Sequence, residues 1–396
     1  MMEGRAGSAV DELSAIDGEL DDAERLVRAN VRRFVRERYL PRAAELYERE
    51  EFPRDLVTEL GELGVLGAGL EGYGCAGLGA VAYGLILQEL EYGDSGLRSF
   101  ASVQGSLAMF AIHAFGTEAQ KHRYLPAMAR GQSIGCFGLT EPDSGSDPGS
   151  MQTRARPDGS DFVLDGTKMW ITNAPIADVA VIWAKVAAGG AESIRGFLVE
   201  RGQPGFGTSR VRGKMSLRSS ETGAIHLEGC RVPADAALEH KPGLGAPLRC
   251  LNEARLGIAW GALGAAKACF DCALAYAKER VQFGVPIAKK QLVQAEFADM
   301  ASELVKAELL SLHFSRRKER GEKPAPAQVS LCKRNNVAMA LAVARSARNL
   351  LGANGILLDY PVVRHLLNLE SVYTYEGTHQ IHTLVLGKAL TGEDAF

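Results

Sequence analysis

Long apolar runs are missing from the sequence. No uninterrupted run approaches the roughly 18–20 residues that a membrane-spanning helix needs, and the stretch 256–266 (LGIAWGALGAA) is too short. The amino-terminal stretch MMEGRAGSAVDELSAIDGELDD is acidic. It has neither the apolar core of a secretory signal nor the basic character of an organelle transit peptide. We therefore expect a soluble protein with no targeting segment and no membrane insertion.

An excess of charge and a disulfide framework are missing as well. The 45 lysines and arginines nearly balance the 48 aspartates and glutamates, which leaves a net charge of −3. This balance does not favour binding to nucleic acid or to an anionic membrane. The seven cysteines are an odd number and lie mostly in apolar stretches, which predicts reduced thiols. These features predict a cytoplasmic protein of bacterial type.

What is present is the composition of an ordinary globular protein, 46% hydrophobic and 23% charged, in a chain of 396 residues. Helical spacing dominates residues 1–133 and 244–396, and strand patterns dominate residues 134–243. The sequence thus predicts an α+β fold, mainly α, with an N-terminal helical domain (1–133), a middle β domain (134–243) and a C-terminal four-helix bundle (244–396).

The expected elements follow from local patterns. Helices are expected at residues 55–66, 78–92, 102–115, 118–129, 255–279, 291–320, 326–351 and 379–390. Strands are expected at 179–186 and 196–200, and around the alternating Ile225 and Leu227. Asp165-Gly166 is expected to form the turn of a hairpin, since Asp-Gly suits a turn with positive φ.

Several short motifs have a structural explanation that outweighs the functional one. The overlapping GxGxxG strings within 67–77 follow a helical pattern rather than a strand, which argues against a dinucleotide site. The GDSG string at 93–96 lies among helices, so we expect a helix-terminating turn rather than a protease nucleophile loop. The CxxC pair at 269–272 lies inside a helix, and His379 and His382 have no third ligand at useful spacing. We expect no metal site.

Four segments carry residue types that composition does not explain. They are 137–147 (FGLTEPDSGSD), 168–173 (KMWITN), 280–284 (RVQFG) and 373–382 (YTYEGTHQIH). The first offers hydroxyl and main-chain N–H groups to a polar ring or a phosphate. In the last, Glu376 lies in an aromatic loop, where burial would raise the pKa of its carboxyl into the range of a general base. Taken singly, each segment also reads as a turn, a core strand, a helix break or a helix cap.

Together and in this order, the four segments resemble the acyl-CoA dehydrogenase family over residues 24–396. The resemblance implies an N-terminal helical domain, a middle β-barrel domain and a C-terminal four-helix bundle, assembled as a homotetramer with FAD. The implied reaction removes a proton from the α-carbon and a hydride from the β-carbon of an acyl-CoA thioester. The implied catalytic residues are Glu376, as the base, and Tyr375 beside it. Electrons would pass to electron-transfer flavoprotein.

The resemblance also implies the cofactor-binding residues. Those expected near the flavin ring and the CoA entrance are Phe137, Leu139, Thr140, Gly145, Ser146, Trp170, Ile171, Thr172, Thr378 and Gln380. Those expected at the adenosine diphosphate half, reached from a neighbouring subunit, are Arg280, Gln282, Phe283, Gln291, Asn349, Gly352 and Gly355. Ala353 departs from the family's usual glycine, and its methyl group could crowd the diphosphate.

Substrate preference is predicted from the segment 91–104 (EYGDSGLRSFASVQ), which is similar to the glutaryl-CoA dehydrogenase branch. Arg98 would bind the distal carboxylate of glutaryl-CoA as a forked cation, with Ser102 as a hydrogen-bond partner and Glu91 orienting the arginine. The full set of implied substrate-binding residues is Arg98, Ser102, Glu91, Ser146, Arg255 and Gly377. Segments 135–142 (GCFGLTEP) and 331–336 (LCKRNN) also look like this branch.

Tyr375 matches the decarboxylating members of the branch, so the expected products are crotonyl-CoA and CO2, as in lysine and tryptophan degradation. Gln380 stands where glutaryl enzymes often carry aspartate. One alternative is a dehydrogenase for a short-chain or branched acyl thioester, in which Arg98 is structural. Another is a relative that acts on a different dicarboxylic thioester, carrier-bound or not decarboxylated. A non-redox thioester hydrolase or transferase would need a Ser–His or Cys–His set that we do not find. An inactive helical scaffold is disfavoured by the intact Glu376.

Overall fold

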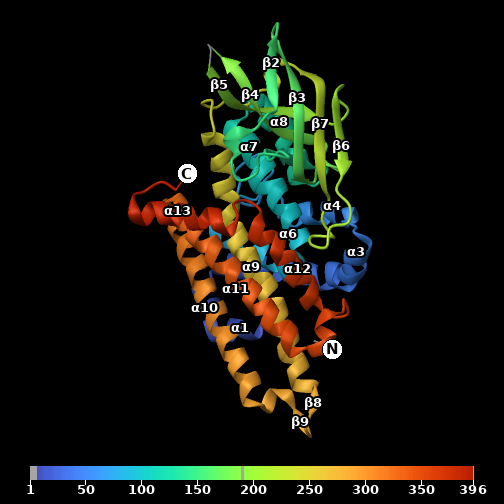
Figure 1. The fold of residues 1–396 in the computed structure, drawn as a ribbon, viewed down its shortest axis with the longest axis vertical. Helices are drawn as coiled ribbons and strands as arrows, with labels where there is room; N and C mark the ends of the chain where they lie inside the picture. The colour runs from blue at the N-terminus through green and yellow to red at the C-terminus, as the bar shows by residue number, and fades with distance from the viewer. Residues whose placement is uncertain (1–6, 189–190, 396) are drawn as a thin grey trace.

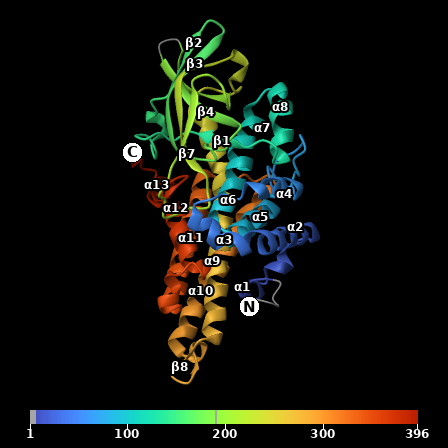
Figure 2. The same ribbon diagram turned by 90° about the vertical axis from the view of Figure 1, so that its right-hand side faces the viewer.

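The computed structural model describes residues 7–188 and 191–395. A block of helices is followed by a β-sheet and then by a long helical bundle, so the predicted α+β, mainly α class is confirmed (Figure 1). The sheet lies at one end of the molecule, and the bundle runs from beneath it to the opposite end (Figure 2).

The N-terminal block consists of eight α-helices in the described residues, of which the fifth and the sixth are the most buried. The helices are α1 (Ala9–Ser14), α2 (Asp22–Phe34), α3 (Ala43–Arg49), α4 (Val57–Glu62), α5 (Ala80–Gly93), α6 (Ser95–Ser102), α7 (Phe110–Phe115) and α8 (Glu118–Ala129). A wide helical turn, Val103–Met109, joins α6 to α7. The Asp94 side chain accepts a hydrogen bond from the N–H of Gly96 (2.6 Å) and so caps α6. The GDSG string is therefore a helix junction, as expected.

Seven strands form the sheet. They are β1 (Gly135–Gly138), β2 (Arg154–Asp158), β3 (Asp161–Thr172), β4 (Val179–Ala188), β5 (Ala191–Glu200), β6 (Phe206–Arg210) and β7 (Thr222–Val232). The order is β1-β4-β2-β3-β7-β6, with β5 paired to β4. Gln104, from the helix junction, accepts the N–H of Gly135 (2.7 Å) and donates to the carbonyl of Ser133 (2.8 Å). It ties the start of the sheet to the helices.

The predicted hairpin turn at Asp165-Gly166 is wrong. The turn lies earlier, at residues 159–160, where Asp158 faces Asp161 across the β2–β3 pair. Gly166 lies inside β3 at a shift in the register with β7, and a Cβ there would overlap Thr153. An Asp-Gly pair suits a bulge as well as a turn, because both need a residue without a side chain. The sequence pattern alone could not separate the two.

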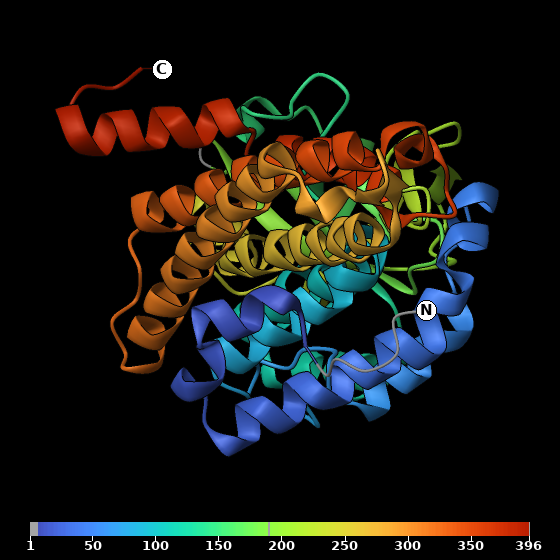
Figure 3. The ribbon, with the colours of Figure 1, turned by 90° about the horizontal axis from the view of Figure 1, so that it is seen from below.

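The C-terminal helices are long. They are α9 (Gly245–Glu279), α10 (Gln291–Glu319), α11 (Pro326–Leu350), α12 (Pro361–Thr374) and α13 (His379–Thr391), with a small hairpin of β8 (Val281–Gln282) and β9 (Val285–Pro286) between α9 and α10. The bundle is built from α9, α10, α11 and α12. Residues 379–390, predicted from the sequence as the fourth helix of the bundle, form α13 instead, and α12 was not predicted. In the structure α13 packs against α11 and then extends away from the bundle (Figure 3).

Helix α9 is the central helix of the bundle. By length and mean hydropathy it could cross a membrane, but 89% of its most apolar 18-residue window is buried inside the protein. A helix is predicted at residues 255–279, but a count of uninterrupted apolar runs does not show that this helix is long and apolar enough to span a membrane. A helix that is apolar on all sides and buried to this extent is typical of the core of a globular protein, so the high hydropathy of α9 is explained by its packing inside the bundle.

Helices α5 and α9 approach each other closely through glycines of α9. A Cβ on Gly264 would overlap the main-chain oxygen of Gln88, and a Cβ on Gly257 would overlap the side chain of Leu87. Because a main-chain oxygen cannot move without disturbing α5 itself, Gly264 sets the distance between the two helices.

We expect G264A to lower the free energy of unfolding by about 1–3 kcal/mol through overpacking, measured by urea denaturation of the holoprotein. The matched control is G387A, also inside a helix, where a Cβ meets nothing within 4 Å. The control should be neutral or up to about 1 kcal/mol more stable, since alanine favours helix over glycine. Equal effects of the two substitutions would contradict the assigned role of Gly264.

Candidate active site

A tight turn between α12 and α13 carries the predicted catalytic residues. Glu376 has φ 51° and Gly377 has φ 89°, so two successive residues adopt left-handed conformations. For glutamate this costs about 1–2 kcal/mol. A Cβ on Gly377 would lie 2.7 Å from Nε2 of His382, so glycine is required here for space as well as for conformation. Thr378 then accepts the N–H of Ile381 (3.1 Å) and caps α13.

Two cations hold the main chain of this turn. Nε of Arg255, on α9, donates to the carbonyl oxygen of Glu376 (2.8 Å). Nζ of Lys333, on α11, donates to the carbonyl oxygens of Tyr375 and Gly377, the latter at 2.7 Å, and lies 3.4 Å from that of Glu376. A strained turn clamped by its surroundings is typical of a functional site.

Glu376 is half-buried, with one oxygen of its carboxyl removed from solvent. Its Oε2 is buried and has no hydrogen-bond partner within the described residues. Removal from water raises the pKa of Glu376, and Lys333, Arg98 and Arg255 oppose that rise. An orphaned buried carboxyl with a raised pKa is suited to accept a proton from a bound molecule.

Arg98 lies beneath Tyr375 in a buried cluster. Its side chain is 1% exposed, and its Nε bonds to Oε2 of Glu91 at 2.5 Å. Oε1 of Glu91 accepts a hydrogen bond from Ser95 (2.7 Å). Arg98 also donates to the Tyr375 hydroxyl, and its guanidinium carbon lies 5.6 Å from the centre of the Tyr375 ring. The structure therefore brings together Glu91, Arg98, Tyr375 and Glu376. Ser102 instead contacts Ser106, with 3.3 Å between the hydroxyls.

The segments expected near the flavin ring meet along β3. The N–H of Met169 donates to the carbonyl of Thr140 (2.9 Å), which fixes the loop after β1 beside this strand. Trp170, also with positive φ, leaves its indole 59% exposed. Gly145, Ser146 and Gln380 are exposed, and Thr140, Thr172 and Thr378 are half-buried. Phe137, Leu139 and Ile171 point into the core, so they can offer only main-chain groups at the surface.

A second set of predicted cofactor residues lies at the other end of the bundle. Arg280, Gln282 and Phe283 belong to the β8–β9 hairpin, Gln291 begins α10, and Asn349, Gly352 and Gly355 lie where α11 ends. Phe283 is 94% exposed. From Lys333 to Asn349 the helix rises roughly 24 Å. Within one protomer this distal set is not brought to Glu376 (Figure 1).

Sequence reasoning missed the lysines that support the site. Lys333 lay in the quoted segment 331–336 but was given no role. Lys168, on β3, is fully buried and bonds to Glu141 (2.8 Å), which also accepts the N–H of Thr153 (3.0 Å). This pair anchors the loop that carries Gly145 and Ser146. Lys168 precedes the apolar run Met169–Ile171, whereas Lys333 is followed by Arg334 and two asparagines, so no local pattern marked Lys333 as buried.

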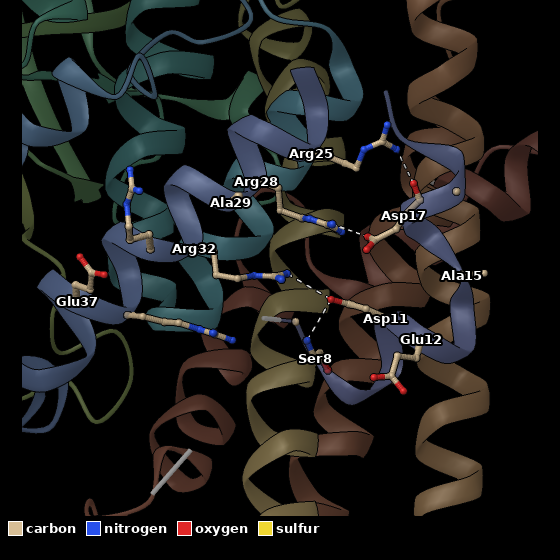
Figure 4. Close-up of a pocket in the computed structure, with 14 residues that line it drawn as sticks. Ser8, Asp11, Glu12, Ala15, Asp17, Arg25, Arg28, Ala29, Arg32 and Glu37 are labelled. Atoms are coloured by element: carbon tan, nitrogen blue, oxygen red, sulfur yellow. Dashed lines mark hydrogen bonds and ion pairs between the residues drawn. The ribbon is translucent and has the colours of Figure 1, made fainter. Parts of the chain in front are cut away.

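A cleft of about 920 Å³ lies elsewhere, between the N-terminal segment and α2 (Figure 4). It contains several arginines, but their charges are balanced locally. Arg28 pairs with Asp17 (2.5 Å), and Arg32 pairs with Glu89 (2.7 Å). No residue of the Glu376 turn lines this cleft. In the described part of the chain no group of His, Cys, Asp and Glu could hold a metal ion, and the seven cysteines are free thiols.

Comparisons with known proteins agree along the whole chain. The family models "Acyl-CoA dehydrogenase, N-terminal domain", "middle domain" and "C-terminal domain" match residues 21–132, 136–230 and 241–391. The short-chain specific acyl-CoA dehydrogenase of Bos taurus mitochondria is 36% identical over 372 residues, which cover 93% of this chain and 90% of that protein.

Two solved structures are also similar, and both are described as glutaryl-CoA dehydrogenase from Mycobacterium smegmatis. One is 56% identical with a TM-score of 0.95. The other, in complex with FADH2, is 52% identical with a TM-score of 0.96. Each match covers 98% of this chain and 100% of the other. The exposed Trp170 and the threonine hydroxyls along β3 and α13 fit a flavin, and FAD is the cofactor.

We expect W170A to weaken FAD binding about tenfold or more, because a stacked aromatic face is lost. Flavin absorbance per protein and fluorescence titration of the apoprotein with FAD measure this. L13A removes another exposed apolar side chain, on α1 and 67% exposed. This control should leave FAD affinity unchanged. If W170A retains FAD as tightly as the parent protein, Trp170 does not contact the ring.

Proposed function

We propose a substrate and a second chemical step for this chain, which belongs to the acyl-CoA dehydrogenase family. The substrate is glutaryl-CoA, which is oxidised between its α- and β-carbons and then decarboxylated to crotonyl-CoA and CO2. The observation that carries the proposal is the cluster of the buried Glu91 and Arg98 with the half-buried Tyr375, the residue directly before Glu376. The two similar structures described as glutaryl-CoA dehydrogenases support it.

In the first step Glu376 removes the α-proton. The charge that develops on the thioester oxygen needs fixed donors, and the main-chain N–H of Glu376 is one that the turn holds in place. When bound, FAD accepts the hydride that leaves the β-carbon. Because the turn is clamped by Arg255 and Lys333, the carboxyl and the N–H keep a constant relation to the bound thioester.

Arg98 is proposed to bind the distal carboxylate of the substrate. A guanidinium keeps its charge and can donate two parallel hydrogen bonds to a carboxylate. Arg98 is 1% exposed, and Glu91 already compensates its charge. The distal carboxylate of a dicarboxylic thioester would form hydrogen bonds with Arg98. A monocarboxylic acyl chain would instead place methyl or methylene groups against the guanidinium, so the dicarboxylic substrate is favoured.

Decarboxylation then breaks the bond between the γ-carbon and the carboxylate of glutaconyl-CoA. The electron pair of that bond delocalises into the conjugated thioester as a dienolate, and CO2 leaves. Glu376, protonated in the first step, returns a proton and yields crotonyl-CoA. Tyr375 lies between Arg98 and the Glu376 turn, where its hydroxyl accepts a hydrogen bond from Arg98. With the distal carboxylate bound to Arg98, Tyr375 would lie beside the group that is lost.

The assembly, electron acceptor and location are proposals as well. The distal set of predicted cofactor residues, exposed at the far end of the bundle apart from the buried Gly355, supports a homotetramer in which a neighbouring subunit completes each FAD site. Electron-transfer flavoprotein is the proposed acceptor, and the cytoplasm the proposed location, both expected from the sequence.

A second candidate is oxidation of an unbranched short-chain acyl-CoA such as butyryl-CoA, or of another dicarboxylic thioester, carrier-bound or not decarboxylated. Two observations favour the short-chain alternative. The curated relative from Bos taurus is a short-chain enzyme, and Glu91 already neutralises Arg98 without any substrate. In that case Arg98 would only stabilise the junction of α5 and α6.

Anaerobic mixing of the purified holoprotein with glutaryl-CoA tests the proposal. We expect the flavin absorbance to fall and mass spectrometry to show crotonyl-CoA with release of CO2. E376Q should show neither change. Accumulation of glutaconyl-CoA would contradict only the decarboxylation step. Bleaching by butyryl-CoA, with no response to glutaryl-CoA, would support the short-chain candidate.

The double substitution R98M/E91Q tests the role of Arg98. Replacing Arg98 alone would strand the buried Glu91 carboxylate and destabilise the fold, so both partners become neutral together. We expect kcat/KM for glutaryl-CoA to fall about a hundredfold or more, while kcat/KM for butyryl-CoA stays the same or rises. An equal loss on both substrates would mean that Arg98 is structural.

A further inference from the structure

Lys333 is buried beneath the catalytic turn and bonds in an unusual way. Its side chain is 2% exposed, on the face of α11 that packs under α12 and α13. The acceptors of its ammonium group are main-chain carbonyls of three consecutive residues, Tyr375, Glu376 and Gly377. Lys168 and Lys267 are equally buried, but each bonds to carboxylates, Lys168 to Glu141 and Lys267 to Asp11 and Glu308. Lys333 is therefore not explained as half of a buried ion pair.

We propose that Lys333 is a positioning residue that holds the turn at Tyr375–Gly377, in which Glu376 and Gly377 are left-handed, and that keeps a cation beside the carboxyl of Glu376. This inference rests on the proposed role of Glu376 as the base. It adds a residue to the reaction that touches neither the thioester nor the flavin but acts through the main chain and the charge of the base.

The geometry of the ammonium group fits this role. The ammonium nitrogen carries three N–H donors. The carbonyl oxygens of Tyr375, Glu376 and Gly377 all lie within hydrogen-bond distance of Nζ, so one cation can bind all three. Arg255 donates to the Glu376 carbonyl from α9. Residues of two helices, α9 and α11, thus hold the main chain of the turn, which keeps the Glu376 carboxyl in one orientation.

The charged and titratable groups that face Glu376 are Arg98 on α6, Arg255 on α9, Lys333 on α11, His382 on α13, Tyr83 on α5 and the adjacent Tyr375. Burial raises the pKa of both tyrosines, so their hydroxyls are neutral. Burial lowers the pKa of His382 to about 3, so this ring is neutral, and it bonds to Ser330 (2.9 Å). Glu91 offsets the charge of Arg98. Burial raises the pKa of Glu376, and among the nearby charges Lys333 opposes this rise most strongly.

The sign of the effect follows. A base works in its deprotonated form, and a nearby cation stabilises that form. Replacing Lys333 by a neutral side chain therefore raises the pKa of Glu376 and moves the acidic limb of the pH profile to higher pH. Burial also lowers the pKa of Lys333 itself, against the attraction of Glu376. The carboxylate and the ammonium thus stabilise each other in the charged state.

The test compares K333M and K333Q with the parent holoenzyme. The first readout is the pH profile of kcat/KM with whichever of glutaryl-CoA or butyryl-CoA the parent oxidises. The second is exchange of the α-proton of that substrate into D2O, followed by mass spectrometry. We expect both variants to shift the acidic limb upward by about one pH unit, which is a tenfold loss of activity below the limb. Above the limb K333Q, which keeps a donor for the carbonyls, should exceed K333M.

K267M is the matched control, since it removes another buried lysine from the bundle, bonded to Asp11 and Glu308 rather than to the turn. It should lower the thermal unfolding temperature without moving the pH profile. FAD content and unfolding temperature report the fold of every variant; should K333M not fold, K333Q carries the test. Unshifted profiles in K333Q would overturn the inference. A parent protein that neither oxidises nor exchanges either substrate would instead overturn the proposed function.

Discussion

The close contact between α5 and α9 is the constraint on which the rest of the structure depends. Glycines line α9 where it meets α5, and a Cβ on Gly261 would overlap the Glu91 carboxylate that Arg98 binds. Because these helices can approach so closely, Glu91 and Arg98 of the N-terminal block lie against the same helix that carries Arg255. The position of the base is thus set by helix packing rather than by the turn alone.

A second junction joins all three regions of the chain. Asp94, between α5 and α6, bonds to Arg364 and to Asn368 (3.0 Å) on α12. Asn368 in turn accepts the N–H of Leu217 (2.7 Å) from the loop before β7. A buried charge with every partner in place fixes one arrangement of its neighbours, because any shift would leave a charge unpaired. Arg364 and Asn368 lie in the early and middle turns of α12, the helix that ends at the Glu376 turn.

Electrostatics at the site follow from this packing. Three cations surround one carboxyl, yet the pKa of Glu376 is still raised, because burial outweighs their attraction. Arg98 is compensated by Glu91, while Arg255 and Lys333 bond to main-chain oxygens rather than to the carboxylate. The cations therefore fix the backbone of the base and leave its Oε2 without a partner. A direct ion pair would have held the proton acceptor in an unreactive state.

The sequence by itself determined the fold class, the order of the three regions and most helix positions, and it marked Glu376 as the candidate base, because helical periodicity and short motifs are local signals. The hairpin turn predicted at Asp165-Gly166 was wrong, because the same residue pair favours both a β-bulge and a turn. Helix α12 was missed, since its buried Arg364 and His365 break the apolar pattern that marks a helix. Only the tertiary structure decided that the Tyr375 hydroxyl bonds to Arg98, that Lys333 holds the Glu376 turn, and that Gly264 of α9 meets the main chain of α5. These facts depend on side chains that are remote in sequence and meet only when the helices pack.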